Sequence, residues 1–163
     1  MSLRDNIERV EQRMETALRR AGRRREEITL VAVTKKFSPE VIREAYNLGL
    51  RVFGENYVQE FAGKRAALGD LAGAEFHLIG HLQSNKVKYI IETVQLIHTV
   101  DDEPVAKEID KRAVKVGKVQ DVLVEVHTTN EATKYGVKPE QTLALIKNIA
   151  RLQNIRVCGL MTM

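Results

Sequence analysis

Apolar and polar residues follow two patterns in turn along this chain. The first stretch has apolar residues at helical spacing and predicts a helix from Leu3 to Leu18 that ends at Gly22. After it, short apolar runs typical of buried strands alternate with amphipathic stretches. The runs predict strands over residues 28–33, 51–54, 75–79, 95–100, 121–127 and 155–161. The stretches between them predict helices over residues 38–49, 58–68, 85–93, 103–116 and 139–152.

This β/α alternation predicts a parallel sheet, either doubly wound or closed into a barrel. The chain lacks the Gly-x-Gly-x-x-Gly and Gly-x-x-x-x-Gly-Lys motifs, so nucleotide-binding versions of the doubly wound sheet lose their best support. We therefore expect an α/β fold of the TIM-type (β/α) barrel class. A complete barrel takes about 250 residues and eight strands. This chain has 163 residues and only about six predicted strands. We expect residues 1–163 to form one barrel domain whose last two β/α units belong to a longer polypeptide or another chain.

The composition fits one folded domain. Of the 163 residues, 44% are hydrophobic, which is enough for a core. No stretch approaches the roughly 18 consecutive apolar residues that cross a bilayer, and the first residues lack the apolar segment of a secretion signal. The single cysteine, Cys158, cannot form an internal disulfide, and its apolar strand context predicts a packed, inert thiol. We therefore expect a cytoplasmic protein that does not contact a membrane.

Much of the net charge of +4 comes from one cluster of arginines close to the end of the first helix. Its members are Arg19, Arg20, Arg23, Arg24 and Arg25. The cluster leaves nucleic-acid binding open, although no recognised nucleic-acid motif or set of interleaved aromatic residues accompanies it. We favour the simpler interpretation, a solvated helix end whose cations complement the helix dipole.

Two lysines, Lys35 and Lys36, directly follow the first predicted strand. A parallel sheet binds its ligands at the carboxyl ends of its strands, so one of these lysines should reach a pocket. Partial burial would favour the neutral amine, which is the form that attacks an aldehyde. Strand alternation places the two side chains on opposite faces without deciding which one points inward. The alternative is that both are ordinary solvated lysines at a strand end.

Polar residues also follow the other strands. Asn56 follows the second strand, where its amide could orient a ring hydroxyl or an imine, or simply cap the next helix. His81, with Gln83 and Ser84, either lines the pocket rim or belongs to a plain loop. Further candidates for the rim are His98, Asp101, His127, Asn130 and Lys134.

Other kinds of chemistry have weaker support. His77 and His81 are four residues apart, but they lie on a strand and its exit rather than on a helix, and no further ligands complete a metal site. No Gly-x-Ser-x-Gly elbow supports a hydrolytic triad. One lysine at a strand end, with polar residues at successive strand ends, fits imine chemistry better than hydrolysis.

Several segments together carry a family resemblance. They are Val31–Lys35, Phe53–Glu60, His77–Lys86, His98–Asp101 and Gly159–Thr162. In order and spacing they resemble the pyridoxal phosphate homeostasis proteins, over nearly the whole chain. The resemblance implies a barrel like the N-terminal domain of alanine racemase, without the second domain that supplies racemase catalysis.

The resemblance also implies roles for individual residues. The family holds pyridoxal 5'-phosphate as a lysine aldimine, and its lysine stands at the position of Lys35. Asn56 matches the asparagine beside the cofactor, and His81 and Met161 fall on motif positions near the pocket. The family commonly has Asn where this chain has His127. Family members also continue into a Gly-Met-Ser-x-Asp segment and a glycine-rich strand end that bind the phosphate, so we expect residues 1–163 alone to bind the cofactor weakly.

The leading hypothesis is therefore a pyridoxal 5'-phosphate carrier, a monomer or weak dimer, that serves vitamin B6 homeostasis without turnover. Apoenzymes that depend on pyridoxal phosphate are candidate recipients. The competing enzyme hypothesis is an amino-acid racemase or decarboxylase that uses the same cofactor. The sequence offers no clear second acid or base for such an enzyme. A nucleic-acid-binding protein is the third and least favoured hypothesis.

Overall fold

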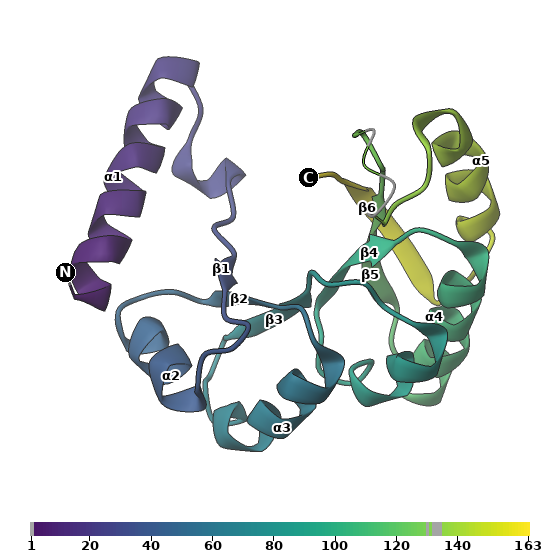
Figure 1. Ribbon diagram of the computed structural model, residues 1–163, viewed down its shortest axis with the longest axis horizontal. Coiled ribbons are helices and arrows are strands. Elements are labelled where there is room, and N and C mark those ends of the chain that lie inside the picture. Colours follow the sequence, from purple (N-terminus) through teal and green to yellow (C-terminus); the bar gives the residue numbers. More distant parts are fainter. Residues whose placement is uncertain (1, 130, 132–134) are drawn as a thin grey trace.

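The computed structural model describes residues 2–129, 131 and 135–163. In this part of the chain, six parallel strands form one sheet, and their order across the sheet is their order in the sequence (Figure 1). The strands are β1 (Ala32–Val33), β2 (Val52–Glu55), β3 (Glu75–Leu78), β4 (Leu96–Val100), β5 (Gln120–Glu125) and β6 (Ile155–Met161). The helices are α1 (Leu3–Ala21), α2 (Pro39–Asn47), α3 (Val58–Leu68), α4 (Glu103–Lys115) and α5 (Pro139–Ile149), with short 3-10 helices at η1 (Arg25–Glu27) and η2 (Ser84–Tyr89).

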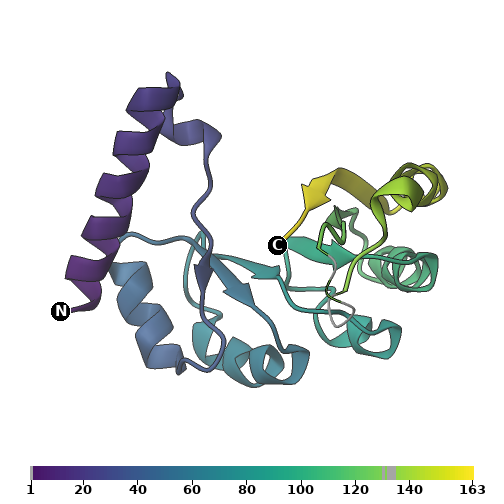
Figure 2. The ribbon, with the colours of Figure 1, turned by 45° about the horizontal axis from the view of Figure 1, so that its top comes forward.

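The sheet is curved, and its helices lie on the outer side. Helices α2 to α5 follow the convex face, whereas α1 stands beside β1 at one edge (Figures 1 and 2). Parallel strands in sequence order with their helices outside are the arrangement of a TIM-type barrel. The predicted α/β class is therefore confirmed. Among the described residues, β1 and β6 are the edges of the sheet.

Two apolar clusters fill the space between the sheet and the outer helices. The larger joins Leu78 and Ile97 of the strands to Ile109 of α4. The smaller joins Phe53 of β2 to Ile42 of α2. All five side chains are 0% exposed, and their removal from water stabilises the fold by about 25 cal/mol per Å² of apolar area. These buried contacts hold in place the strands whose carboxyl ends carry the polar residues.

The first predicted strand is wrong in its length and burial. Of residues 28–33, only Ala32 and Val33 form a strand, because ladder pairing with β2 begins at Ala32. The Val33 side chain is 47% exposed, so the run is not covered on both faces as predicted. An apolar run indicates a strand, but a strand extends only as far as its neighbour supplies hydrogen bonds.

Two smaller predictions also differ from the structure. In place of the helix predicted over residues 85–93, the structure has the 3-10 helix η2. The backbone N–H groups of Lys86 and Ile90 donate to the carbonyls three residues earlier, those of Gln83 and Val87. Cys158 is exposed rather than packed, because it lies on the edge strand β6.

Three of the clustered arginines are in ion pairs within the chain. Arg23 and Arg24 contact Glu27, and Arg25 contacts Glu11 with its nitrogen and oxygen 3.0 Å apart. These pairs neutralise part of the patch and favour its interpretation as a solvated helix end. None of the helices in the described ranges has the length and apolar character needed to span a membrane.

Candidate functional site

A cavity of about 780 Å³ lies at the carboxyl ends of the strands. Every strand contributes to its wall, either directly or through the residues that follow it, because the ends of parallel strands meet at one rim. The residues in this order are Lys35, Asn56, His81, Thr99, Glu125 and Met161. The structure thus brings together all four residues selected from the sequence, namely Lys35, Asn56, His81 and Met161; their role in binding stays a prediction.

The two lysines after β1 lie in different places. Lys35 lines the cavity, and its side chain is exposed rather than enclosed as predicted. Lys36 is not among the lining residues, and its backbone adopts the left-handed conformation with φ of 65°. The turn therefore directs Lys35, and not Lys36, to the cavity.

Two cavity oxygens are buried without a hydrogen-bond partner among the described residues. They are Oδ1 of Asn56 and Oε2 of Glu125. Glu125 is 6% exposed; burial, with the negative charge of Asp101 nearby, raises the pKa of its carboxyl group. Burial likewise raises the pKa of Asp101. Buried polar atoms without partners are rare in folded proteins and indicate a place where a polar ligand can bind.

His81 is held against the cavity wall by two neighbours. Its ring stacks on Tyr135, with ring centroids 3.7 Å apart and an angle of 9° between the planes. Its Nδ1 lies 4.0 Å from Oδ2 of Asp101. The ring of His81 therefore has a defined orientation at the rim.

Gly80 allows the loops after β2 and β3 to approach each other. A Cβ atom at this position would lie 2.2 Å from the carbonyl oxygen of Asn56, which is too close for any side chain. The carbonyl of Gly80 accepts a hydrogen bond from Oγ1 of Thr99 at 2.7 Å. Gly80 thus sets the position of Asn56 in the cavity wall.

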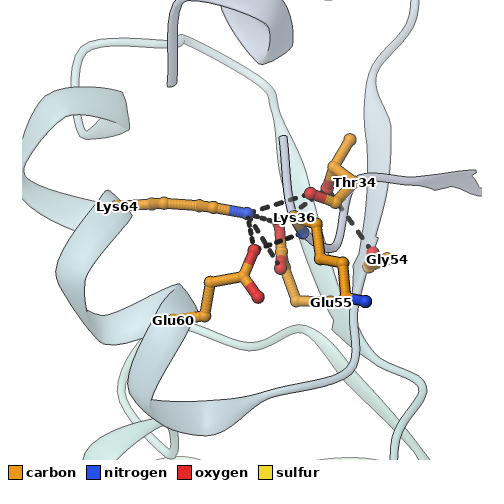
Figure 3. Close-up of polar contacts among 6 residues, drawn as sticks. All are labelled: Thr34, Lys36, Gly54, Glu55, Glu60 and Lys64. Carbon is orange, nitrogen blue, oxygen red and sulfur yellow. Dashed lines mark hydrogen bonds and ion pairs between the residues drawn. The ribbon is translucent and has the colours of Figure 1, made fainter. Parts of the chain in front are cut away.

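A buried ion cluster lies behind the turn that carries Lys35 (Figure 3). Lys64 of α3 extends its ammonium group toward Glu55 of β2 and Glu60 of its own helix. The same group donates to the carbonyl oxygen of Thr34 at 2.9 Å. The sequence analysis missed this cluster. Glu60 and Lys64 are four residues apart on α3, but Glu55 and Thr34 come to them only through the fold.

Other predicted rim residues lie outside the cavity wall. His98 contacts His77, with Nε2 and Nδ1 3.0 Å apart, and neither lines the cavity. His127 contacts Thr129 instead. Asn130 and Lys134 lie outside the described residues. Among the described residues, no group of three or more side chains is arranged to bind a metal ion.

The histidine pair predicts a loss of stability in acid. Burial, followed by the charge of His77, lowers the pKa of His98 from 6.5 to about 4, and burial also lowers the pKa of His77. The unfolded chain therefore binds protons that the folded chain does not, and stability falls as the pH falls from 6.5 to about 4. At about 1.4 kcal/mol per pKa unit, this lowering corresponds to about 3.5 kcal/mol. Because His98 is only partly buried, solvent screens part of the effect, and we expect its contribution to this loss to be roughly 2–3 kcal/mol.

Urea unfolding at several pH values measures this effect. Asp101 and Glu125 affect stability in the opposite direction. Their pKa values are raised in the folded protein, so the folded state binds protons that the unfolded chain does not, and their contribution to stability falls as the pH rises. The comparison is therefore between the wild type and His98→Gln, which keeps a neutral partner for His77. An acid-dependent loss of equal size in both proteins would contradict the prediction.

The sequence from residue 2 to residue 163 matches the family model of the alanine racemase N-terminal domain. A pyridoxal phosphate homeostasis protein of Aquifex aeolicus is 49% identical over 158 residues, which are 97% of this chain and 69% of that protein. The chain belongs to the pyridoxal phosphate homeostasis protein family. The resemblance found in the sequence motifs is thereby confirmed.

Two solved structures are similar to this member of the family. The protein PipY of Synechococcus elongatus, with pyridoxal phosphate bound, is 35% identical with a TM-score of 0.76, over 83% of this chain and 63% of that chain. An unknown protein from Bifidobacterium adolescentis is 35% identical with a TM-score of 0.91, over 98% of this chain and 68% of that chain. Both likenesses support the fold described above.

Among the lining residues that the sequence analysis did not select are Glu125, Lys86 and Tyr135. Glu125 ends an apolar strand, which is the signal that had selected Lys35, and it could have been chosen on the same ground. Lys86 follows the polar run after β3. Tyr135 lies in a segment without a strand signal, so only its stacking on His81 places it in the cavity wall.

Proposed function

We propose that this chain binds pyridoxal 5'-phosphate in the cavity, holds it as an imine on Lys35 and serves the supply of this cofactor without amino-acid turnover. The observation that carries the proposal is the meeting of Lys35 and Asn56 in one cavity at the strand ends. The aldehyde of pyridoxal phosphate condenses with a primary amine, and water leaves as the imine forms.

The cavity fits a cofactor of this kind. Its volume of about 780 Å³ falls within the roughly 300–1,000 Å³ of small-molecule sites. The unpartnered oxygens of Asn56 and Glu125 need hydrogen-bond donors, and a protonated pyridine nitrogen or a ring hydroxyl can donate. His81 offers an aromatic face at the rim. The lining thus combines an amine, polar acceptors and flat side chains.

The proposed lack of turnover is supported by the relatives, which are named for homeostasis. A racemase needs a second group that exchanges a proton on the other side of the substrate carbon. Incubation of the loaded protein with single amino acids tests this directly: we expect no racemisation and no release of carbon dioxide.

Replacement of Asn56 tests whether this residue binds pyridoxal phosphate in the cavity. We expect Asn56→Ala to raise the dissociation constant of pyridoxal phosphate about tenfold, because one hydrogen bond to a ligand contributes about 1–2 kcal/mol. Titration followed by visible absorption measures the change. The control is Asn47→Ala, an exposed asparagine at the end of α2, which should bind as the wild type does. Equal affinity in the two variants would remove Asn56 from the site.

The finer parts of the proposal concern partners. We propose that apoenzymes that use pyridoxal phosphate receive the cofactor, and that transfer to a purified apoenzyme restores its activity. The weak binding expected of residues 1–163 alone, the monomeric or weakly dimeric state and the cytoplasmic location stay predictions. Dialysis, sedimentation and cell fractionation, respectively, measure them.

A further inference from the structure

The ammonium group of Lys64 is enclosed by acceptors. The residue is 7% exposed, and its Nζ lies 3.0 and 3.3 Å from the two carboxylate oxygens of Glu55. It also donates to Oε1 of Glu60 and to the carbonyl of Thr34. A lysine has three N–H groups, so all of them are engaged. Lys64 does not line the cavity, and the proposed function has not used it.

The cluster contacts Thr34 and Lys36 (Figure 3), which are the residues before and after Lys35 in the sequence. Before it, Thr34 is bound twice, since its carbonyl accepts from Lys64 and its Oγ1 donates to Glu55 at 2.7 Å. After it, the N–H of Lys36 donates to Glu60. A left-handed conformation such as that of Lys36 costs a residue with a side chain about 1 kcal/mol or more, so the turn needs such anchors.

The anchored turn decides where Lys35 points. Val33 and Lys35 line the cavity, whereas Thr34 between them is buried on the opposite side, against the ion cluster. Alternate side chains of an extended segment point to opposite faces. Because Thr34 is held against the cluster, the side chain of Lys35 points to the cavity. Backbone hydrogen bonds also hold this segment, since the N–H of Thr34 donates to the carbonyl of Gly54 at 2.9 Å and the N–H of Phe37 donates to the carbonyl of Thr34 at 3.2 Å. The ion cluster adds side-chain anchors on the far side of Thr34, beyond the two-residue strand β1.

We propose that Lys64 is a positioning residue for Lys35: with Glu55 and Glu60, its buried ammonium fixes the turn from Thr34 to Lys36 so that the Lys35 amine enters the cavity. This inference rests on the proposed function, since it gives a reason for the geometry of the reacting amine. The inference also gives a reason why the aldehyde would react with Lys35 and not with Lys64. Lys64 lies outside the cavity with its N–H groups engaged by Glu55, Glu60 and Thr34, so it is not placed to meet an aldehyde there.

The test compares the rates at which variants form the imine with added pyridoxal phosphate, followed by stopped-flow visible absorption. Lys64→Met keeps the length of the side chain and removes its charge and donors, and we expect imine formation to slow at least tenfold. Lys64→Arg keeps the charge and the donors, and should recover most of the wild-type rate. Rates are measured where circular dichroism shows each variant to be folded, so that loss of structure does not enter.

A second variant keeps the test decisive if Lys64→Met does not fold. Glu60→Ala removes the acceptor of the Lys36 N–H; because the Glu60 side chain is 26% exposed, the fold should tolerate it. We expect it to slow imine formation several-fold. Wild-type rates in the folded variants, with only their melting temperatures lowered, would show a purely structural cluster and overturn the inference. A wild-type protein that forms no imine would instead overturn the proposed function itself.

Discussion

Lys35→Ala is expected to abolish the visible absorption band that pyridoxal phosphate acquires on the wild-type protein. The reason is geometric: Lys35 lines the cavity beside Asn56, whereas Lys36 is turned away by its left-handed backbone. The cofactor would then be held only by non-covalent contacts. Titration of wild type and variant with pyridoxal phosphate, followed by absorption and by equilibrium dialysis, separates loss of the imine from loss of binding.

The neighbouring lysine supplies the control for this experiment. Lys36→Ala removes the same charge one residue away, and its side chain does not line the cavity. It should keep the imine band, because its contact with Glu60 uses the backbone N–H, which alanine retains. If Lys36→Ala lost the band and Lys35→Ala kept it, the assignment of the reacting lysine would be wrong.

Glu55→Gln is expected to lower the free energy of unfolding by about 1.5–3 kcal/mol. Glu55 is 1% exposed, and its carboxylate accepts from Lys64 and from Oγ1 of Thr34. Gln keeps the shape of the side chain but removes the charge from the hydrogen bonds with Lys64 and Thr34, and hydrogen bonds to charged groups contribute about 1.5–3 kcal/mol. Lys64 keeps Glu60 as its second ionic partner. Urea unfolding followed by circular dichroism gives the change, provided that the transition stays cooperative.

An exposed ion pair serves as the control for Glu55. Glu92 contacts Arg65 at 3.8 Å, and its side chain is 63% exposed, so Glu92→Gln should cost less than about 1 kcal/mol. The double variant of Glu55→Gln with Lys64→Met should lose less than the sum of the two single variants, because it removes both members of the pair. Equal losses for Glu55→Gln and Glu92→Gln would show that the buried cluster contributes little to stability.

The order of strands and helices could be predicted because periodicity and turn residues are local. Every predicted strand has a counterpart in the structure, and the strand ends meet at one rim as a parallel sheet requires. That geometry alone brings Asn56, His81 and Met161 beside Lys35. The choice of Lys35 over Lys36 came from the family resemblance, and the structure gives it a geometric basis in the turn.

The remaining features depend on contacts between distant segments. The length of β1 depends on its pairing with β2, and the burial of Glu125 depends on the packing of β5 beside β6. Lys64 bonds Thr34, which is 30 residues away in sequence. Lysine side chains are mostly exposed in folded proteins, and only the fold supplies the acceptors that make the burial of Lys64 possible. Local patterns therefore indicated the pair Lys35 and Lys36, and the resemblance selected Lys35, but neither indicated that Lys64 contacts this turn.

Chemical trapping on the wild-type protein tests the central claim most directly. The protein is mixed with pyridoxal phosphate and reduced with borohydride, which converts an imine into a stable amine, and the labelled peptide is then identified by mass spectrometry. We expect the label on Lys35. A label found chiefly on Lys86 or another lysine, or no label despite full binding of the cofactor, would contradict the proposal that Lys35 carries pyridoxal phosphate as an imine.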